Sequence, residues 1–406
     1  MVVMEHWPEV RIGDLGDVFT GRTPSTDQPS YFGDKFPFIT PGDMHQGKYA
    51  RETGRGLSDE GAELLKRIRV PAEAVCVSCI GWQMGNAIMT DRPSFTNQQI
   101  NTIVPRANVD PSFLFYSLRL RKDELLSLGS STGVRTPILN KSAFSSLTVK
   151  TPPLPIQKRI AGILSAYDDL IAVNERRIAI LEEMGRRVFE ETLREANFPT
   201  ATLETACVEI QSGRRPKGGI AGDGEVPSIG AENINGLAKH DFGKEKLIPR
   251  SFFDKMSKGK LRHGDVMMYK DGAHIGRLAM AWSGYPHKEC AVNEHVFLLR
   301  SNRISPSFLY FWLSQSFMQQ TIRGKNTNAA QPGLNQRAVL SLPIVLPSKN
   351  ILNEFDLIVT PIMDLIFALA HTTINLRATR DLLLPRLISG QVDVSEAATL
   401  NTAAAG

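Results

Sequence analysis

Two cysteines, Cys76 and Cys79, have the Cys-x-x-Cys spacing of half a zinc site. They fall in an apolar run that is typical of a β-strand, and side chains three positions apart on a strand point to opposite faces. The other two cysteines, Cys207 and Cys290, form no second pair of the required spacing. The pattern therefore predicts buried thiols, and we expect neither a bound metal nor a cofactor.

Motifs that bind a nucleotide, a catalytic metal or a methyl donor do not occur in the sequence. No Gly-Lys pair is followed by Ser or Thr, as a phosphate-binding P-loop requires, and there is no His-Glu-x-x-His or Gly-x-Ser-x-Gly motif. Neither an Asn/Asp-Pro-Pro-aromatic motif nor an intact glycine-rich methyl-donor loop is found. The sequence therefore predicts a chain without catalytic residues.

Polar residues instead collect in short, glycine-flanked turns that occur twice in the chain. Arg, Asn and Gln make bidentate hydrogen bonds to base edges, while Lys and Thr more often contact phosphates. Because the polar residues differ between equivalent turns, we favour binding over solvated loops. The candidate DNA-binding residues of the first half are Arg22, Thr23, His45, Lys48, Gln83, Asn86, Arg135, Asn140 and Lys141. Those of the second half are Arg214, Arg215, Lys217, Asn233, Asn235, Lys270, His274, Arg277, Asn326, Asn328, Gln331 and Asn335.

The elements that position these turns are themselves repeated. The two halves of the 406-residue chain align at an offset of 190 to 196 residues, so the sequence predicts a tandem duplication. A Gly-x-x-x-Gly motif at Gly81 and Gly85, for example, returns at Gly272 and Gly276. Short apolar runs punctuated by Gly, Pro, Asn and Asp alternate with helices in each half. We therefore expect α+β globular domains over residues 1–151 and 197–346.

The segments 152–196 and 347–392 are predicted to be helical. Their apolar stripes, spaced by threes and fours, are Ile156, Ile160, Ile163, Tyr167, Leu170, Asn174, Ile178, Leu181, Met184 and Val188, and Ile351, Phe355, Ile358, Ile362, Leu365, Leu369, Leu376 and Leu383. Such stripes favour an antiparallel coiled coil with pseudo-two-fold symmetry. The alternative is that each helix packs on its own domain.

Two signals predict that each helical segment is interrupted. Ser165 begins a Ser-x-x-Asp capping motif, and Pro361 follows Thr360, a favourable N-cap residue. We expect a short helix, a break at residues 165 and 360, and then a long helix to about residues 195 and 388. Residues 393–406 are expected to form a flexible tail.

Composition limits the cellular setting and the kind of partner. No stretch approaches 18 consecutive apolar residues, the start lacks a secretory signal, and four cysteines suit a reducing compartment, so we expect a cytoplasmic protein without a membrane partner. The formal net charge is +5 and the pI is near 9.0. Residues 199–346 carry 19 basic and 12 acidic groups, which favours a polyanionic partner.

In several of these residues the chain resembles the specificity (S) subunits of type I restriction-modification enzymes. The resemblance covers nearly the whole chain. It lies in the two repeated domains, each opening with a Gly-Arg-x-Pro turn, in Pro152–Gln157 before the first long helix, and in Leu383–Gly390 at the end of the last. It departs from the family's usual pattern at Ile156, and the glutamine of the first helix has no equivalent in Ser348–Ile351.

The resemblance implies a non-catalytic subunit in which each α+β domain is a target recognition domain that reads one half of a split site in double-stranded DNA. It also implies that the helices form a spacer that binds two methyltransferase (M) subunits, through which restriction (R) subunits assemble. Two alternatives stay open: the specificity subunit of a type II system with a fused methyltransferase-nuclease, and an adaptor that binds proteins through both domains.

Overall fold

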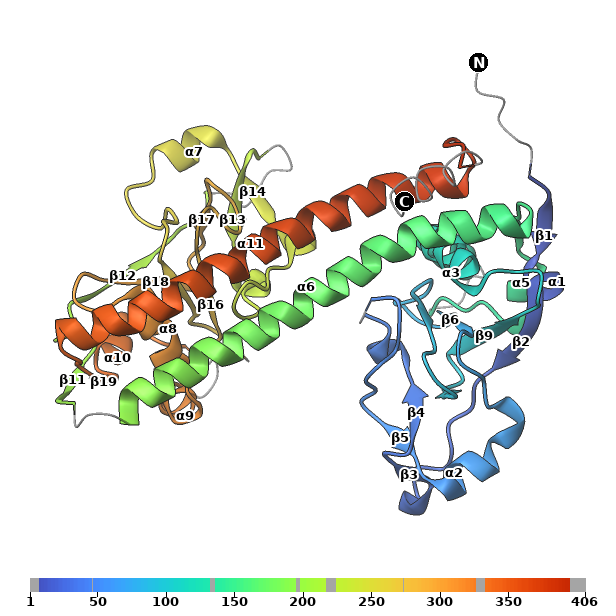
Figure 1. Cartoon of the computed structure of the whole chain (residues 1–406), viewed down its shortest axis with the longest axis horizontal. Coiled ribbons are helices and arrows are strands. Elements are labelled where there is room, and N and C mark those ends of the chain that lie inside the picture. The colour runs from blue at the N-terminus through green and yellow to red at the C-terminus, as the bar shows by residue number, and fades with distance from the viewer. Residues whose placement is uncertain are drawn as a thin grey trace, which may run out of the picture. The chain divides into compact units, whose positions relative to one another are not determined.

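The computed structural model of the chain describes residues 7–45, 47–131, 136–194, 198–216, 224–272, 274–325 and 333–394. The chain forms two compact units, Met1–Ile171 with Leu376–Gly406 (unit 1) and Ala172–Asn375 (unit 2). Two long helices, α6 (Leu154–Arg194) and α11 (Lys349–Ile388), pass from one unit into the other (Figure 1). Each unit therefore combines a globular part with a portion of both long helices.

Unit 1 contains two small sheets and a strand pair. Its strands are β1 (Glu9–Arg11), β2 (Gly16–Thr20), β3 (Phe32–Gly33), β4 (Phe36–Ile39), β5 (Gly56–Leu57), β6 (Val75–Ser78), β7 (Ala87–Met89), β8 (Phe95–Thr96), β9 (Ile100–Pro105) and β10 (Thr148–Lys150). Its shorter helices are α1 (Ile12–Leu15), α2 (Asp59–Leu64), α3 (Pro111–Leu120), α4 (Lys122–Ser130) and α5 (Lys141–Ser146), with 3-10 turns η1 (Pro29–Tyr31), η2 (Pro41–Asp43) and η3 (Lys66–Ile68). The strand orders are β2-β9-β6-β7 and β3-β5-β4-β8, and β1 pairs with β10.

Unit 2 repeats this plan. Its strands are β11 (Thr200–Thr202), β12 (Val208–Ser212), β13 (Val226–Ile229), β14 (Lys246–Ile248), β15 (Val266–Tyr269), β16 (Leu278–Met280), β17 (Ala291–Val292), β18 (Val296–Ser301) and β19 (Pro343–Val345). Its shorter helices are α7 (Arg250–Asp254), α8 (Pro306–Ser314), α9 (Ser316–Gly324) and α10 (Gln336–Leu340), with 3-10 turns η4 (Ala231–Asn233) and η5 (Phe242–Lys244). The strand orders are β12-β18-β15-β16 and β14-β13-β17, and β11 pairs with β19.

The larger sheets have the same strand order, and β14-β13-β17 of unit 2 matches β5-β4-β8 of unit 1, which confirms the tandem duplication that the sequence predicts. Strand β3 has no counterpart among the described strands of unit 2. The larger sheet of each unit is antiparallel, whereas the smaller sheet contains one parallel pair, β4–β8 in unit 1 and β13–β17 in unit 2. The helix after the last strand of the larger sheet begins in the same way in both units. Its N-cap, Asp110 or Ser305, accepts a hydrogen bond from the backbone N–H three residues on, and proline follows the cap.

Within each unit the long helices pack both on each other and on the globular part. In unit 1, Ile160 and Leu164 of α6 share one buried cluster with Phe113 of α3 and Leu387 of α11. In unit 2, the ring of Phe189 lies 5.0 Å from that of Phe308 in α8 and 6.1 Å from that of Phe355 in α11, measured between centroids. The two predicted packing modes are therefore combined.

Contacts in unit 1 show that α6 and α11 run antiparallel there. Arg159 of α6 donates to the carbonyl of Val394, 3.4 Å away, and Asp168, farther along α6, pairs with Arg380, earlier in the chain. Both partners of this ion pair have side chains that are only 8% exposed, and Asp168 also accepts a 2.5 Å hydrogen bond from Tyr116 Oη. Burial and the neighbouring carboxylate raise the pKa of Tyr116, so it stays a hydrogen-bond donor.

The predicted breaks at residues 165 and 360 are wrong, because α6 and α11 are each continuous. Ser165 does not cap a helix; its hydroxyl accepts a 2.8 Å hydrogen bond from Lys48. Pro361 is exposed inside α11, where its missing N–H costs about 3 kcal/mol. Val359 and Met363 are fully buried on the opposite face, and burial of such side chains contributes about 1.5–3 kcal/mol each, which offsets that cost.

The prediction of buried thiols is confirmed for Cys76, Cys79 and Cys290 and is wrong for Cys207, which is exposed. Cys76 and Cys79 belong to different buried clusters, on opposite sides of β6, and Cys290 is also buried. Burial raises the pKa of each of these three thiols to about 12, whereas Cys207 is exposed. All four cysteines are free.

Two features of the C-terminal segment modify the expectations from the sequence. Of the predicted tail, residues 395–406 lie outside the described part of the chain, but Val394 is buried. Helix α11 is long and apolar enough to cross a membrane by length and composition, with 33% of its most apolar window buried. Core helices pass the same test, and α11 contributes side chains to the buried cluster of each unit.

Candidate nucleic-acid interface

The turn between β6 and β7 presents polar and aromatic side chains at the surface of unit 1. Its two glycines, Gly81 and Gly85, have φ angles of +91° and +82°, which side chains other than glycine rarely adopt. The N–H of Gly85 bonds to the carbonyl of Ser78 at 2.8 Å, which closes the turn. Trp82 is left 74% exposed and Gln83 is exposed beside it. The backbone of the turn is thus fixed by its glycines and this hydrogen bond, and the side chains of Trp82 and Gln83 are available to a ligand.

The equivalent turn of unit 2, between β15 and β16, has the same backbone and different side chains. Gly272 and Gly276 have φ angles of +89° and +84°, and the N–H of Gly276 bonds to the carbonyl of Tyr269 at 2.9 Å. His274 is exposed here. Arg277 bridges to a neighbouring turn, donating to Asn235 Oδ1 at 3.1 Å.

A second pair of turns begins with Gly21 and Gly213. A Cβ added at Gly21 would lie 2.2 Å from two backbone oxygens, and one at Gly213 would lie 1.5 Å from a third, so both positions require glycine. Arg22 and Arg214 follow these glycines and are exposed. Thr23, next to Arg22, donates a 2.6 Å hydrogen bond to Gln98.

Ion pairing and aromatic contacts position the basic residues of unit 2. Arg215 lies 3.3 Å from Glu294, and the guanidinium of Arg214 lies 5.3 Å from the ring centroid of Phe252. Lys270, which is partly exposed, lies over the ring of Phe297. Arg214 is therefore exposed with its orientation set by an aromatic neighbour, as suits contact with an anionic ligand.

Three predicted DNA contacts are corrected by the structure. Lys48 is buried, with its ammonium bonded to Ser165 of α6, and burial lowers its pKa against the opposing effect of Asp169. Asn233 is 1% exposed and ties its own turn together, accepting from the N–H of Gly230 and donating to a backbone carbonyl. Asn86 is 9% exposed in the turn after β6. The sequence identified these turns, but polar side chains in a turn can face inward to satisfy its backbone.

Of the other predicted DNA-binding residues, two cap helices and two are exposed at the surface. Asn140 and Asn335 are exposed N-cap residues, each accepting from the backbone N–H three residues on, in α5 and α10. His45 and Lys141 are exposed. The remaining candidates, Arg135, Lys217, Asn326, Asn328 and Gln331, lie outside the described residues.

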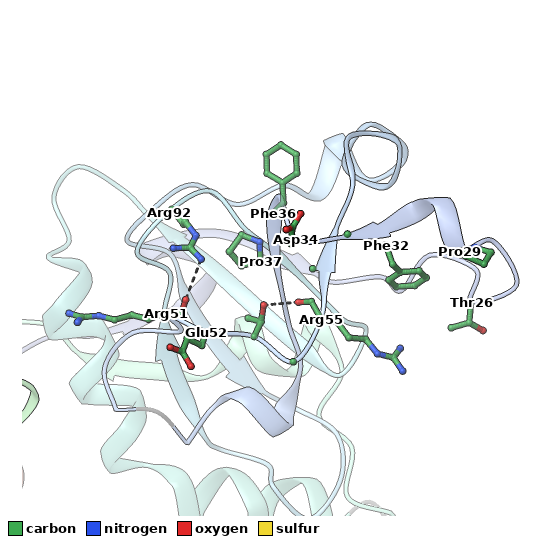
Figure 2. A pocket seen from close by; sticks show the side chains of 14 residues that line it. Thr26, Pro29, Phe32, Asp34, Phe36, Pro37, Arg51, Glu52, Arg55 and Arg92 are labelled. Carbon is green, nitrogen blue, oxygen red and sulfur yellow. Dashed lines mark hydrogen bonds between the residues drawn. The ribbon is translucent and has the colours of Figure 1, made fainter. Parts of the chain in front are cut away.

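Unit 1 contains a cavity of about 850 Å³ that was not predicted from the sequence (Figure 2). Arg51, Arg55 and Arg92 line it together with the rings of Phe32 and Phe36. Arg92 donates to the carbonyl of Arg51 at 3.2 Å, and Figure 2 shows this bond across the cavity wall. The phenylalanines come from residues 32–36 and two of the arginines from residues 51–55, and neither segment alone shows the combination of phenylalanine and arginine that suits anionic, aromatic ligands.

Comparison with known proteins gives a consistent result. Residues 4–183 match the type I restriction modification DNA specificity domain. The chain is 37% identical over 166 residues to the type I restriction enzyme HindI specificity subunit of Haemophilus influenzae, a match that spans 40% of this chain and 36% of that protein. It is 22% identical over 418 residues to the MjaIX specificity subunit of Methanocaldococcus jannaschii, spanning 97% of this chain and 95% of that protein.

The fold agrees with these sequence matches. The crystal structure of a type I restriction-modification S subunit from M. genitalium superposes with a TM-score of 0.59 at 16% identity, covering 94% of this chain and 96% of that one. Residues 4–183 therefore match the type I restriction modification DNA specificity domain, and over nearly its whole length the chain is similar to the MjaIX specificity subunit.

Proposed function

We propose that this chain reads a DNA site made of two unlike halves, one half with each repeat. In this proposal residues 1–151 and 197–346 are the target recognition domains, and residues 152–196 and 347–392 are the spacer. The observation that carries the proposal is the pair of β-hairpin turns with the same glycine geometry and different exposed side chains, Trp82 and Gln83 in unit 1 and His274 in unit 2. A shared framework with different surface residues is what two different half-sites require.

Charge supports a polyanionic ligand, most clearly in unit 2. Arg214 is exposed beside Arg215, and the segment 199–346 has a basic excess. Lysine and arginine that neutralise phosphates release counterions, so the DNA affinity should fall steeply as salt is raised. An adaptor that binds proteins through apolar contacts would show little salt dependence, which makes the slope a direct test between the two functions.

We propose further that α6 and α11 carry two M subunits, to which R subunits attach. Helix α11 leaves apolar side chains at its surface in unit 2: Leu357 is 77% exposed, Ile358 is 54% exposed and Leu365 is 49% exposed. Ile180 and Met184 of α6 are also about half exposed in that unit. Apolar side chains of this number on one helix mark a surface for a protein partner.

The half-site model is tested by co-expressing the chain with its methyltransferase and sequencing the host DNA for modified bases. We expect one motif of two half-sites. Replacing Arg22 and Gln83 with alanine should alter or abolish recognition of one half-site, and replacing Arg214 and His274 should affect the other. The matched controls are Arg11→Ala in unit 1 and Arg303→Ala in unit 2, which remove equal charge outside the recognition turns. Variants in unit 2 that changed both halves alike would overturn the model.

The partner surface is tested by co-purification. The double variant Leu357→Ser, Leu365→Ser should lose the M subunit while keeping its helical circular dichroism, because both side chains are exposed in the chain itself. Glu354→Ala, an exposed change on the same helix, is the control. Undiminished co-purification of the double variant would show that M binds elsewhere.

A further inference from the structure

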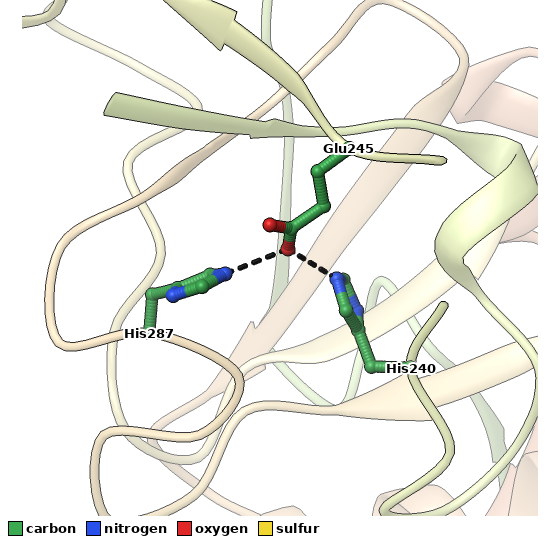
Figure 3. A group of neighbouring side chains, drawn as sticks. All are labelled: His240, Glu245 and His287. Atoms are coloured by element: carbon green, nitrogen blue, oxygen red, sulfur yellow. Dashed lines mark hydrogen bonds and ion pairs between the residues drawn. The ribbon is translucent and has the colours of Figure 1, made fainter. Parts of the chain in front are cut away.

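Two histidines and a glutamate converge in unit 2, apart from the recognition turns. His240 lies between η4 and η5, Glu245 directly precedes β14, and His287 lies in the segment between β16 and β17. Their ligand atoms, the Nε2 of each histidine and a carboxylate oxygen, all lie within 4.8 Å of one another. Figure 3 shows both rings directed at the same Glu245 oxygen.

The distances place these atoms around a common point. His240 Nε2 lies 2.5 Å from Glu245 Oε1, and His287 Nε2 lies 2.6 Å from the same oxygen. A tetrahedral zinc ion with ligands at about 2.0–2.1 Å holds its ligand atoms about 3.3 Å apart. Rotation of the side chains that moves each ligand atom by less than 1 Å would therefore separate these atoms enough to admit an ion.

The surroundings suit a metal ion with an open coordination position. The exposed fraction of the side chain is 4% for His240, 12% for Glu245 and 30% for His287, so the group is enclosed except on the side of His287. The ring of Phe242 lies 4.6 Å from that of His240 and 5.6 Å from that of His287, between centroids, which provides an apolar wall. Two imidazoles and one carboxylate, with water at the fourth position, are a ligand set that zinc uses in proteins.

Another histidine of unit 2, His295, has two carboxylate neighbours and gives a useful contrast. His295 approaches Asp271 through Nδ1, at 2.9 Å, and Glu294 through Nε2, at 3.3 Å. These two nitrogens lie on different edges of the ring, so the three groups do not converge on one point. At His240 and His287, by contrast, one nitrogen of each ring faces one shared oxygen.

Unit 1 does not provide an equivalent set. Asp43 and Asn233 cap corresponding turns 190 residues apart, and the same offset places Ala50 and Arg55 at the positions of His240 and Glu245. Neither side chain is a metal ligand in proteins. Among the described residues, the convergence occurs in unit 2 and does not follow from the repeated framework.

We propose that His240, Glu245 and His287 bind a zinc ion that joins three separate segments of unit 2. The site is independent of the proposed DNA-reading function, since none of the three residues belongs to the recognition turns. By binding residues from all three segments, the ion fixes the chain on both sides of η5 to the segment that follows β16. An ion that binds only the folded chain raises its unfolding midpoint.

The test uses the untagged full chain, stripped with EDTA and titrated with zinc against a chromophoric chelator. We expect one equivalent of zinc to bind and the thermal unfolding midpoint to rise. His287→Ala and Glu245→Gln should each weaken binding by at least about 100-fold, because even the loss of a residue that only supports a ligand typically costs 10–100-fold. His295→Ala is the matched control and should bind zinc like the wild-type chain.

The outcomes distinguish a metal site from a hydrogen-bonded cluster. His287 is the most exposed of the three, so His287→Ala should fold, as circular dichroism of the stripped protein would verify; it keeps the test valid if Glu245→Gln does not fold. The absence of stoichiometric zinc binding by the wild-type chain would overturn the proposal, as would equal binding by His287→Ala. In either case the three side chains would form only a hydrogen-bonded clamp, and the DNA-recognition tests would be unaffected.

Discussion

At the residue scale, Trp82 combines high exposure with a fixed backbone. Trp82→Ala should change the free energy of unfolding by no more than about 0.5 kcal/mol, since the side chain is 74% exposed. The affinity for DNA should fall by about tenfold, because aromatic side chains that stack on bases or wedge between them contribute about 1–3 kcal/mol. Equilibrium urea unfolding and a fluorescence binding assay measure the two effects.

The control is Leu64→Ala, which removes another exposed apolar side chain of unit 1, 51% exposed at the end of α2. It should leave the DNA affinity unchanged. Equal losses of affinity in both variants would show that the Trp82 effect is not specific to the turn.

The four thiols offer a second residue-scale prediction. At pH 8 a thiol with a pKa of about 12 is ionised in only about one molecule in ten thousand, so Cys76, Cys79 and Cys290 should resist thiol reagents in the native protein. Cys207 is exposed and should react. We expect a disulfide-exchange reagent to modify one thiol in the folded chain and four after denaturation, with Cys207→Ser abolishing the native reaction. Rapid modification of a second thiol would contradict the burial described.

The positions of the recognition turns could be predicted from the sequence, but the directions of their polar side chains could not. Glycines such as Gly21 and Gly85 mark backbone that only glycine allows, so the positions of the turns were readable from the sequence. The direction of a neighbouring polar side chain was not, because Lys48 and Asn233 bond inward whereas Arg22 does not. Residues far apart in the sequence, such as Ser165 opposite Lys48, decide that direction.

At the element scale, the continuity of the long helices shows where local signals fail. Ser165 and Pro361 are sound helix-start signals taken alone, yet both lie inside helices whose other faces are buried. Tertiary packing outweighs a local preference of about 3 kcal/mol when the helix buries side chains on both sides of the position. The length and spacing of the apolar stripe were therefore better guides than the capping signals.

Pro361 gives a direct measurement of that local cost. Pro361→Ala should stabilise the chain by about 2–3 kcal/mol, because alanine restores a helical hydrogen bond and the exposed ring loses little packing. Equilibrium urea unfolding measures the change, and Ala368→Ser, an exposed substitution on the same helix, is the control. A destabilised Pro361→Ala variant would mean that the proline sets a bend that the packing of α11 requires.

The buried ion pair between α6 and α11 in unit 1 should affect the free energy of unfolding more than Pro361 does. Arg380→Met leaves Asp168 buried with Tyr116 as a donor but without its cation, and loss of one partner of such a pair typically costs about 3–5 kcal/mol. The double variant Asp168→Asn, Arg380→Met should recover part of that loss, since no unpaired charge remains. A double-mutant cycle in urea measures the coupling, and additive single effects would show that the pair contributes nothing specific.

At the scale of the whole molecule, α6 and α11 are the elements that pass between the two units in the part of the chain that the structure describes. The tandem repeat was predictable because each copy keeps its glycines, caps and strand order. The division of the chain into units was not, because each unit takes part of both helices, and those parts pack on the globular core. Contacts of this kind join residues more than 200 positions apart, such as Asp168 and Arg380, which local periodicity does not reveal.

We propose that α6 and α11, which pass between the two units, set the spacing of the two-part DNA site. Seven residues inserted into α6 after Ile171, and seven into α11 after Asn375, would lengthen both helices where they pass between the units. Seven residues add about 10.5 Å, and they turn the helix to within about 20° of two full turns, so the buried faces stay nearly in register. At about 3.4 Å per base pair, the gap between the half-sites should grow by about three base pairs.

Sequencing of methylated host DNA from cells that co-express the M subunit reads out the gap and both half-sites together. We expect the half-sites to be unchanged, since the insertions leave every recognition turn intact. Insertion into α6 alone is the control: it puts the paired helices out of register and should lower stability without producing a defined longer gap. An unchanged gap in the double insertion, or a contiguous motif in the wild-type chain, would show that the spacing between half-sites is set by something other than α6 and α11.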